Sequence, residues 1–216
     1  MRQTVFFLIL LFTTAVSFSQ DNLLDPDYQE SILDSLRDEF GSNKKYPQAY
    51  EVSILTALSY YPELKKVAIS FRRKNIRTTM SALPHGLFLL TKDENRKYVI
   101  NIGTNGAISS LLLPELSFNA RVGVIGHELA HIVDYETMSK VDMIKFSSDY
   151  LLSKDKRSEI EQKTDKIAIG KGLGEQIYFF SDYVFNHASV PRKYLKYKER
   201  IYFSPEEIAN ILEIEK

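Results

Sequence analysis

The chain has no cysteine, and this absence limits both its chemistry and the ways in which its fold can be stabilised. Without thiols it has no disulfide framework, no lipid-modified N-terminal cysteine and no thiolate ligand for a metal. Histidine is also scarce, with four residues in a chain of 216. Any metal site must therefore be built from a few histidines together with glutamate or aspartate.

An excess of charge of one sign is missing as well. Lysine and arginine number 28, aspartate and glutamate also number 28, and the formal net charge is +0 at pH 7. Such a balance creates no field that would steer the protein toward nucleic acid or anionic lipid. We therefore expect no nucleic-acid partner.

Long apolar runs are absent after the first 19 residues, so we expect no membrane span in the mature chain. Residues 1–19 have the pattern of a secretory signal peptide, with Arg2 in a positive start, a mostly apolar stretch from Val5 to Phe18, and Ser17 and Ser19 as small residues before a cut. This predicts cleavage after Ser19 and export to a periplasm or the extracellular space. The alternative is an uncleaved N-terminal anchor, although the apolar stretch is shorter than the ~20 residues that a span requires.

The remaining pattern predicts one α+β domain over residues 20–216, with helices and a sheet in 20–118 and a helical part in 119–216. Alternating residues predict a small, mostly antiparallel sheet with strands at 65–72, 78–83, 86–90 and 98–102. Apolar periodicity and end signals predict helices at 26–40, 48–60, 119–136, 157–169 and 205–214, with 140–152 partly helical. Asn119 is expected to cap the third of these helices.

The most informative stretch is a His-Glu-x-x-His motif, His127-Glu128-Leu129-Ala130-His131, inside an apolar helical run. At 3.6 residues per turn the two histidines lie on one helical face, separated by roughly 6 Å along the axis, so that both imidazoles can reach one cation. Glu128 points about 100° further round, where a general base can hold a water molecule. The plainer alternative, a chance pair of histidines or a buried polar network, would leave three polar groups without partners among apolar neighbours.

Two histidines are not enough, because a catalytic zinc takes three protein ligands and keeps one position open. A third histidine six residues after the second is excluded, since that position is Thr137. Of the other two histidines, His85 lies in a proline-flanked loop and His187 lies far downstream. The best remaining donor is a carboxylate on another helix.

Glu161 and Asp165 are spaced so that both lie on the same face of a helix. One of them can bind a metal while the other supports a ligand, because a ligating histidine needs a carboxylate or carbonyl at its second ring nitrogen. Asp165 can do this for His127. The alternative is a solvated acidic face among neighbouring lysines, but the upstream motif favours the ligand, with Glu159 and Glu175 as other possible donors.

Together, HELAH at 127–131 and EQKTD at 161–165 resemble the gluzincin metallopeptidases, whose third ligand is a glutamate in an ExxxD helix. Residues 76–170 are similar, more loosely, to the prenyl-protease-like branch of that clan. This chain departs from the branch at Ser81, where the branch usually has asparagine, and it lacks the transmembrane helices that the branch often carries.

The resemblance implies a zincin-like fold in which the sheet packs on the motif helix, and one zinc ion per chain. It implies that His127, His131 and Glu161 bind the zinc, that Glu128 activates a water molecule, and that Asp165 supports a ligand. The expected function is therefore that of a secreted zinc-dependent endopeptidase. A peptide or protein substrate would be held by adding a strand to the sheet edge near Tyr98–Thr104.

A peptidase of this kind also needs a donor for the negative charge that develops on the substrate carbonyl. The aromatic segment after the Glu161 helix offers His187, Tyr183 and Tyr178, with His187 as the leading candidate. Two other functions stay open at this point. One is a non-catalytic, zinc-stabilised peptide-binding domain, and the other is an amidase that acts on cell-envelope material.

Overall fold

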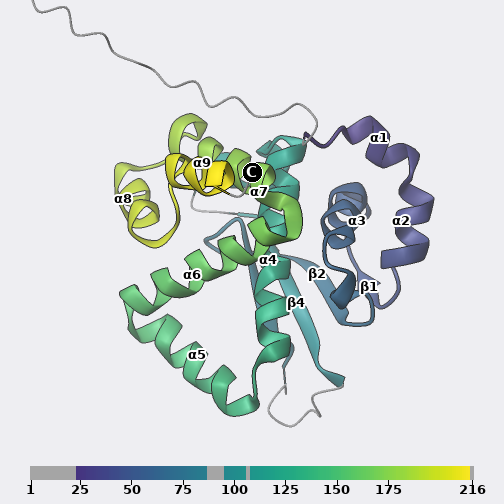
Figure 1. Ribbon diagram of the computed structural model, residues 1–216, viewed down its shortest axis with the longest axis horizontal. Coiled ribbons are helices and arrows are strands. Elements are labelled where there is room, and N and C mark those ends of the chain that lie inside the picture. The colour runs from purple at the N-terminus through teal and green to yellow at the C-terminus, as the bar shows by residue number, and fades with distance from the viewer. Residues whose placement is uncertain (1–22, 87–94, 106–107, 215–216) are drawn as a thin grey trace, which may run out of the picture.

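The computed structural model describes residues 23–86, 95–105 and 108–214 (Figure 1). The predicted signal peptide and most of the strand predicted at 86–90 lie outside these described residues. The described part is α+β, with a small mixed sheet and helices packed around it. Within it, no helix is both long and apolar enough to cross a membrane.

The sheet has four strands in the order β1-β2-β4-β3, namely β1 (Lys44–Lys45), β2 (Ala68–Lys74), β3 (Met80–Pro84) and β4 (Lys97–Gly103). The β1–β2 and β2–β4 pairs are parallel, and only β3–β4 is antiparallel. The prediction of a mostly antiparallel sheet was therefore wrong. The alternation of apolar and polar residues along a strand indicates which side chains are buried, but it does not indicate whether the neighbouring strand is parallel or antiparallel.

The position of β4 corrects the predicted site of substrate binding. Val99 on β4 is the register partner of Ser70 on β2 and also of Leu83 on β3, so β4 lies inside the sheet with both sides paired. A central strand has no free backbone groups to accept a substrate strand. Among the described residues β3 is the edge next to β4, and the prediction of an edge at Tyr98–Thr104 was wrong.

The first predicted helix is two helices, α1 (Pro26–Ser31) and α2 (Leu33–Phe40), which meet at the non-helical Ile32. Asp25 caps α1 by accepting a hydrogen bond from the backbone N–H of Asp27. The second predicted helix begins with a 3₁₀ turn at Gln48–Tyr50 and continues as α3 (Glu51–Ser59), whose buried residues pack against the next helix.

The motif lies on α4 (Phe118–Thr137), which runs through the centre of the molecule in front of the sheet (Figure 1). The prediction that Asn119 caps this helix was wrong. Ser117 is the cap, since its hydroxyl accepts from the N–H of Ala120, whereas Asn119 lies in the first turn and bonds to the backbone of Leu24. The apolar run around the motif is buried, and it carries the histidines into the interior.

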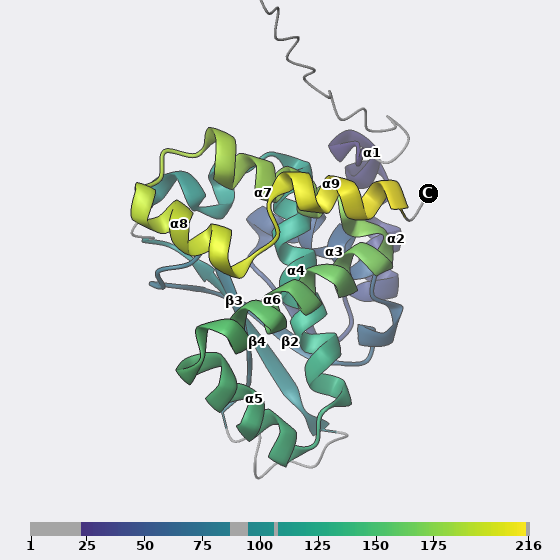
Figure 2. The same ribbon diagram turned by 60° about the vertical axis from the view of Figure 1, so that its left-hand side comes forward.

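The C-terminal part folds over one side of α4 (Figure 2). It consists of α5 (Lys140–Leu152), α6 (Lys154–Ala168), α7 (Gly174–Asp182), α8 (Arg192–Ile201) and α9 (Pro205–Ile214). Residues 140–152, predicted as partly helical, are helical throughout. A π-helical turn, Ile169–Leu173, joins α6 to α7, and Gly172 takes a φ of 91° there, a value that glycine adopts readily.

Candidate metal centre

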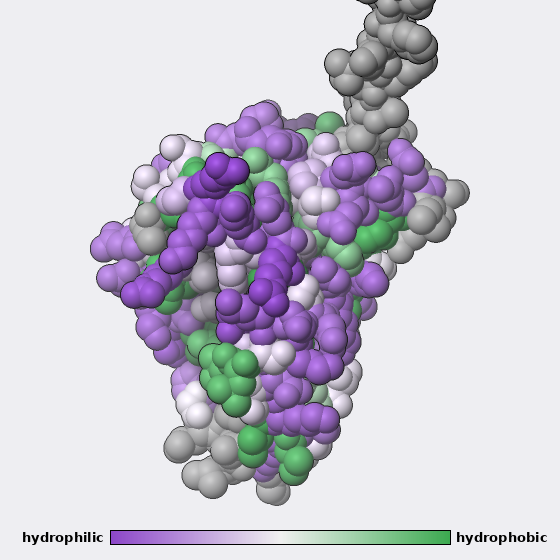
Figure 3. All heavy atoms as spheres, turned by 90° about the vertical axis from the view of Figure 1, so that its left-hand side faces the viewer, coloured by the Kyte–Doolittle hydropathy of each residue, from purple (hydrophilic) through white to green (hydrophobic). Residues whose placement is uncertain are grey.

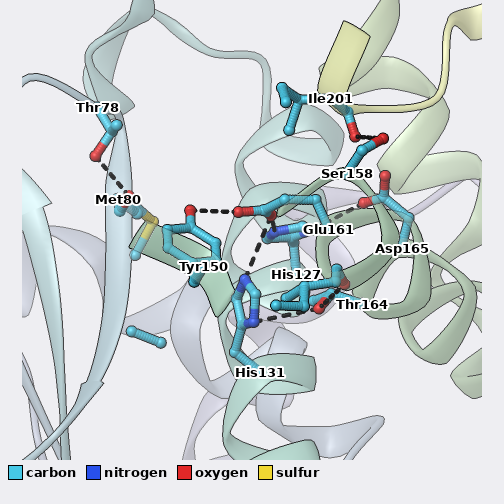
Figure 4. Close-up of polar contacts among 12 residues, drawn as sticks. Thr78, Met80, His127, His131, Tyr150, Ser158, Glu161, Thr164, Asp165 and Ile201 are labelled. Carbon is cyan, nitrogen blue, oxygen red and sulfur yellow. Dashed lines mark hydrogen bonds and ion pairs between the residues drawn. The ribbon is translucent and has the colours of Figure 1, made fainter. Parts of the chain in front are cut away.

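The two histidines of the motif lie one turn apart on α4 and face α6 (Figure 4). The Nε2 atom of His127 is 3.0 Å from Oε2 of Glu161, and Nε2 of His131 is 3.5 Å from the same oxygen. The three side chains each offer one ligand atom, and these atoms lie within 4.8 Å of one another. All three residues are buried, so this group could hold a metal ion away from bulk water.

The second nitrogen of each imidazole is also engaged (Figure 4). Nδ1 of His127 is 2.7 Å from Oδ1 of Asp165, and Nδ1 of His131 is 3.2 Å from the hydroxyl oxygen of Thr164. That hydroxyl donates its own proton to the carbonyl of Ile160 at 2.9 Å, so its oxygen accepts from the His131 ring. Both rings are thereby held with Nδ1 protonated and with Nε2 directed at Glu161, where a cation could bind.

The charges in this group fit a cation at its centre. Burial disfavours a charged imidazole, but the carboxylates of Asp165 and Glu161 outweigh burial and raise the pKa of His127 to about 10. Burial alone would raise the pKa of Glu161, yet the two histidines hold that pKa well below its usual value. Without metal, a proton on His127 therefore supplies the positive charge, and a bound cation would take its place.

Glu128 lies beside the ligands and faces the same cleft. Burial raises the pKa of its carboxyl group, and a hydrogen bond with the backbone of Ala82 on β3 acts in the opposite direction. A carboxylate with a raised pKa accepts and returns a proton more readily near neutral pH. Glu128 is therefore a buried carboxyl group that can take up and release a proton beside the candidate ligands.

Tyr150 is a part of the site that sequence reasoning missed. Its hydroxyl donates to Oε1 of Glu161 at 2.5 Å, which leaves Oε2 directed at the two histidines (Figure 4). The residue comes from α5, which folds back along α6. No motif marks Tyr150 among the thirteen tyrosines of the chain, because its role depends on how two helices pack.

A cleft of about 310 Å³ opens beside this group and is lined by β3 and by α4 to α9. Most of the lining is apolar or aromatic, including Met80, Val124, Phe146, Phe180 and Phe203. Two further polar residues reach it from the end of α8, Lys198 and Tyr202, and neither was predicted. The basic and aromatic segment 192–202 is typical of either a solvated helix or a cleft rim, and no motif in it singles out these two residues.

The mouth of the cleft is partly apolar as well. Leu83 on β3 and Leu151 on α5 both line the cleft, and they are 48% and 71% exposed. On the face that carries α5, α6 and α8, apolar patches interrupt the hydrophilic surface (Figure 3). The exposed apolar residues of α5 are Val141, Ile144, Leu151 and Leu152.

The predicted carbonyl donors lie elsewhere. His187 has a 62% exposed side chain that pairs with Asp182 at 3.0 Å. The hydroxyl of Tyr183 donates to the backbone carbonyl of Ser110 at 3.0 Å. Neither residue lines the cleft, and Tyr178 does not line it either. None of the three candidates therefore lies at the candidate metal centre.

The alternative ligands are also outside the group. Glu159 lies on the exposed face of α6 and pairs with Lys156 at 2.7 Å. Glu175 is buried on α7 but does not line the cleft. Of the carboxylates considered as the third ligand, the structure brings Glu161 to the histidines.

Comparisons with models of protein families, with curated proteins and with solved structures found no match to this chain. The likeness to gluzincins therefore depends on the resemblance at 127–131 and 161–165 and on the looser one over 76–170. What the site does must be argued from its own geometry.

Proposed function

We propose that this protein is an exported zinc-dependent endopeptidase of the gluzincin type. The observation that carries the proposal is the meeting of His127, His131 and Glu161 in a buried cluster, with Glu128 facing the same cleft. Two imidazoles and a carboxylate are a donor set used by catalytic zinc sites, which keep one position open. A purely structural zinc has four protein ligands and no use for a neighbouring base.

The residues around the centre have separate tasks in this proposal. A zinc ion bound there would polarise a substrate carbonyl and lower the pKa of a water molecule toward about 7. Glu128 takes a proton from that water as its oxygen attacks the carbonyl carbon, and then gives the proton to the leaving amine. Asp165 and Thr164 keep the imidazoles oriented, while Tyr150 orients Glu161.

The shape of the cleft supports an extended peptide as the substrate. The edge strand β3 lines the cleft along its whole length, so its backbone can pair with a peptide that adds a strand to the sheet. The apolar walls and the apolar mouth favour large apolar side chains next to the bond that is cut. We therefore expect cleavage within hydrophobic segments of peptides or proteins.

The ligand assignment is tested by Glu161→Ala. Purified wild-type protein should contain one zinc per chain, and the variant should lose it, because two histidines alone hold zinc weakly. Metal analysis after dialysis measures this. The matched control is Glu159→Ala, which removes an exposed carboxylate from the same helix. Full zinc content in Glu161→Ala would contradict the assignment.

The role of Glu128 is tested by Glu128→Gln. The variant should retain zinc, because its ligands are intact, but its hydrolysis should fall by about 10²–10⁴-fold, the usual contribution of a general base. A mixed peptide library, digested with and without a chelator and read by mass spectrometry, provides the assay. Zinc-loaded wild-type protein that cuts no peptide in this library would contradict the proposed function.

A further inference from the structure

Lys198 is a cationic residue in the lining of a mostly apolar cleft. It projects from α8 into the cleft, and it is the single lysine or arginine among the described residues that line the cleft. Its ammonium lies 3.7 Å from the centre of the Tyr202 ring and 5.8 Å from that of Tyr194. Within the described part of the chain, no carboxylate forms an ion pair with it. The ammonium is thus positioned by aromatic rings, and its hydrogen-bonding capacity is left for a ligand.

The charges around the cleft explain why a cation belongs there. Glu128, Glu161 and Asp165 together carry one more negative charge than a divalent metal neutralises. A net charge is costly in an apolar cleft, and Lys198 supplies the balancing positive charge. The other lysines of α8, Lys193 and Lys196, are exposed and do not line the cleft.

Tyr202 lies close to both this cation and the candidate metal centre. The centre of its ring is 6.0 Å from that of the His127 ring, and the ammonium of Lys198 lies over the same Tyr202 ring. Lys198 on α8, Glu128 on α4 and the edge strand β3 all line the same cleft, and Glu128 is hydrogen-bonded to the backbone of Ala82 on β3. A substrate that lies along β3 would therefore share the cleft with both the base and the ammonium.

We propose that Lys198 is a catalytic residue that donates a hydrogen bond to the carbonyl oxygen of the bond being cut. This inference rests on the proposed peptidase function. As the water oxygen bonds to the carbonyl carbon, Glu128 takes the proton and the electron pair of the C=O double bond moves onto the carbonyl oxygen. Lys198 stabilises that negative oxygen and keeps its own proton. When the C=O bond re-forms, the C–N bond breaks and the amine leaves with the proton from Glu128.

The kinetic test compares Lys198→Met with Lys196→Met, which changes an exposed lysine on the same helix. Lys198→Met should lower kcat by about 10²–10³-fold, the usual loss for one such donor, and leave KM and zinc content nearly unchanged. Lys198→Arg should recover part of the rate, and Lys196→Met should match wild type. An unchanged kcat in Lys198→Met, or an effect confined to KM, would overturn the proposal.

A binding test needs no turnover and therefore separates this inference from the proposed function. A phosphinic pseudopeptide carries the tetrahedral, negatively charged oxygens of the transition state, whereas a thiol-containing peptide binds zinc through sulfur alone. By calorimetry, Lys198→Met should weaken the phosphinic compound by about 100-fold and leave the thiol affinity unchanged. Equal losses for both compounds, or none, would overturn the role of Lys198.

Two further outcomes are informative. If zinc-loaded wild-type protein cuts no peptide but Lys198→Met selectively loses phosphinic binding, the proposed function fails and Lys198 keeps its assigned contact. If Lys198→Met does not fold, as judged by circular dichroism, Lys198→Gln replaces it, since glutamine is polar and has no charge. Phosphinic binding by Lys198→Gln equal to that of wild type would overturn the proposal.

Discussion

At the scale of single residues, the strongest feature is that both candidate histidine ligands are held at their second nitrogen. Asp165→Asn should weaken zinc binding by about 10–100-fold, because the amide is a poorer acceptor and no longer favours the required tautomer of His127. Competition with a chromophoric chelator measures the affinity. Thr164→Ser, which keeps the hydroxyl next to His131, is the control and should retain the affinity of wild type.

The stability of the metal-free protein should depend on pH in a way that zinc weakens. Because the pKa of His127 is raised to about 10, its interaction with Asp165 and Glu161 stabilises the fold fully below the unfolded pKa of about 6.5. This contribution is lost as the pH rises from about 6.5 to about 10, so Tm should fall over that window. Calorimetry of the zinc-loaded protein, in which the imidazole is already neutral, should show a smaller fall.

The cluster of His127, His131 and Glu161 was predicted from the sequence, because the two histidines, and Glu161 with Asp165, are each spaced within one helix. Spacings of four residues place side chains on one face wherever the helix lies, so the motif on α4 and the carboxylates on α6 needed no tertiary information. The contacts of Tyr150, Lys198 and Tyr202 depend instead on how α5 and α8 pack over the cleft. No local pattern contains that information.

At the scale of elements, the packing of α4 against α7 depends on a glycine. A Cβ atom at Gly123 would lie 2.1 Å from the backbone oxygen of Gln176 on α7, and a backbone atom cannot move aside as a flexible side chain can. Gly123→Ala should therefore destabilise the protein by about 1–3 kcal/mol through overpacking. Urea unfolding measures the change.

Gly170→Ala is the matched control for this prediction. A Cβ atom there would meet no neighbour within 4 Å, and the residue has a negative φ, so the change should be neutral or slightly stabilising. Equal stability of the two alanine variants would show that α7 can shift away from α4 at little cost.

Elements were easier to predict than their arrangement. Capping and periodicity located most of the helices, including α9, where Ser204 and Glu207 bond to each other's backbone N–H groups at its start, but they did not predict α7 or α8. The sheet order was not readable, because β4 inserts between β2 and β3, and so pairs in parallel with β2. Alternating burial is the same for parallel and antiparallel neighbours, so the direction of pairing and the true edge needed the structure.

At the scale of the whole molecule, the candidate centre joins two parts of the fold. Its histidines belong to α4, which packs on the sheet, and its glutamate belongs to α6 in the C-terminal part. The two helices also meet through the bond between Asp165 and His127. A metal held between α4 and α6 would therefore stabilise the packing of the C-terminal helices, which form most of the cleft wall.

Zinc should accordingly raise the stability of the whole protein. A ligand that binds only the folded state adds about 2.7 kcal/mol at 100 times its Kd. For a chain of this size, each kcal/mol shifts Tm by roughly 2–4 °C, so zinc at that excess should raise Tm by about 5–11 °C. Differential scanning calorimetry of chelator-treated protein, with and without added zinc, measures the shift.

The variants show whether that gain comes from this centre. Glu161→Ala should gain little from zinc, because it lacks the ligand that connects α6 to α4, whereas Glu128→Gln should gain as much as wild type. An equal rise in Tm for Glu161→Ala would mean that zinc acts elsewhere on the chain. If zinc raises Tm only in proteins that keep all three ligands, zinc binding at the centre is thermodynamically linked to the packing of the C-terminal helices.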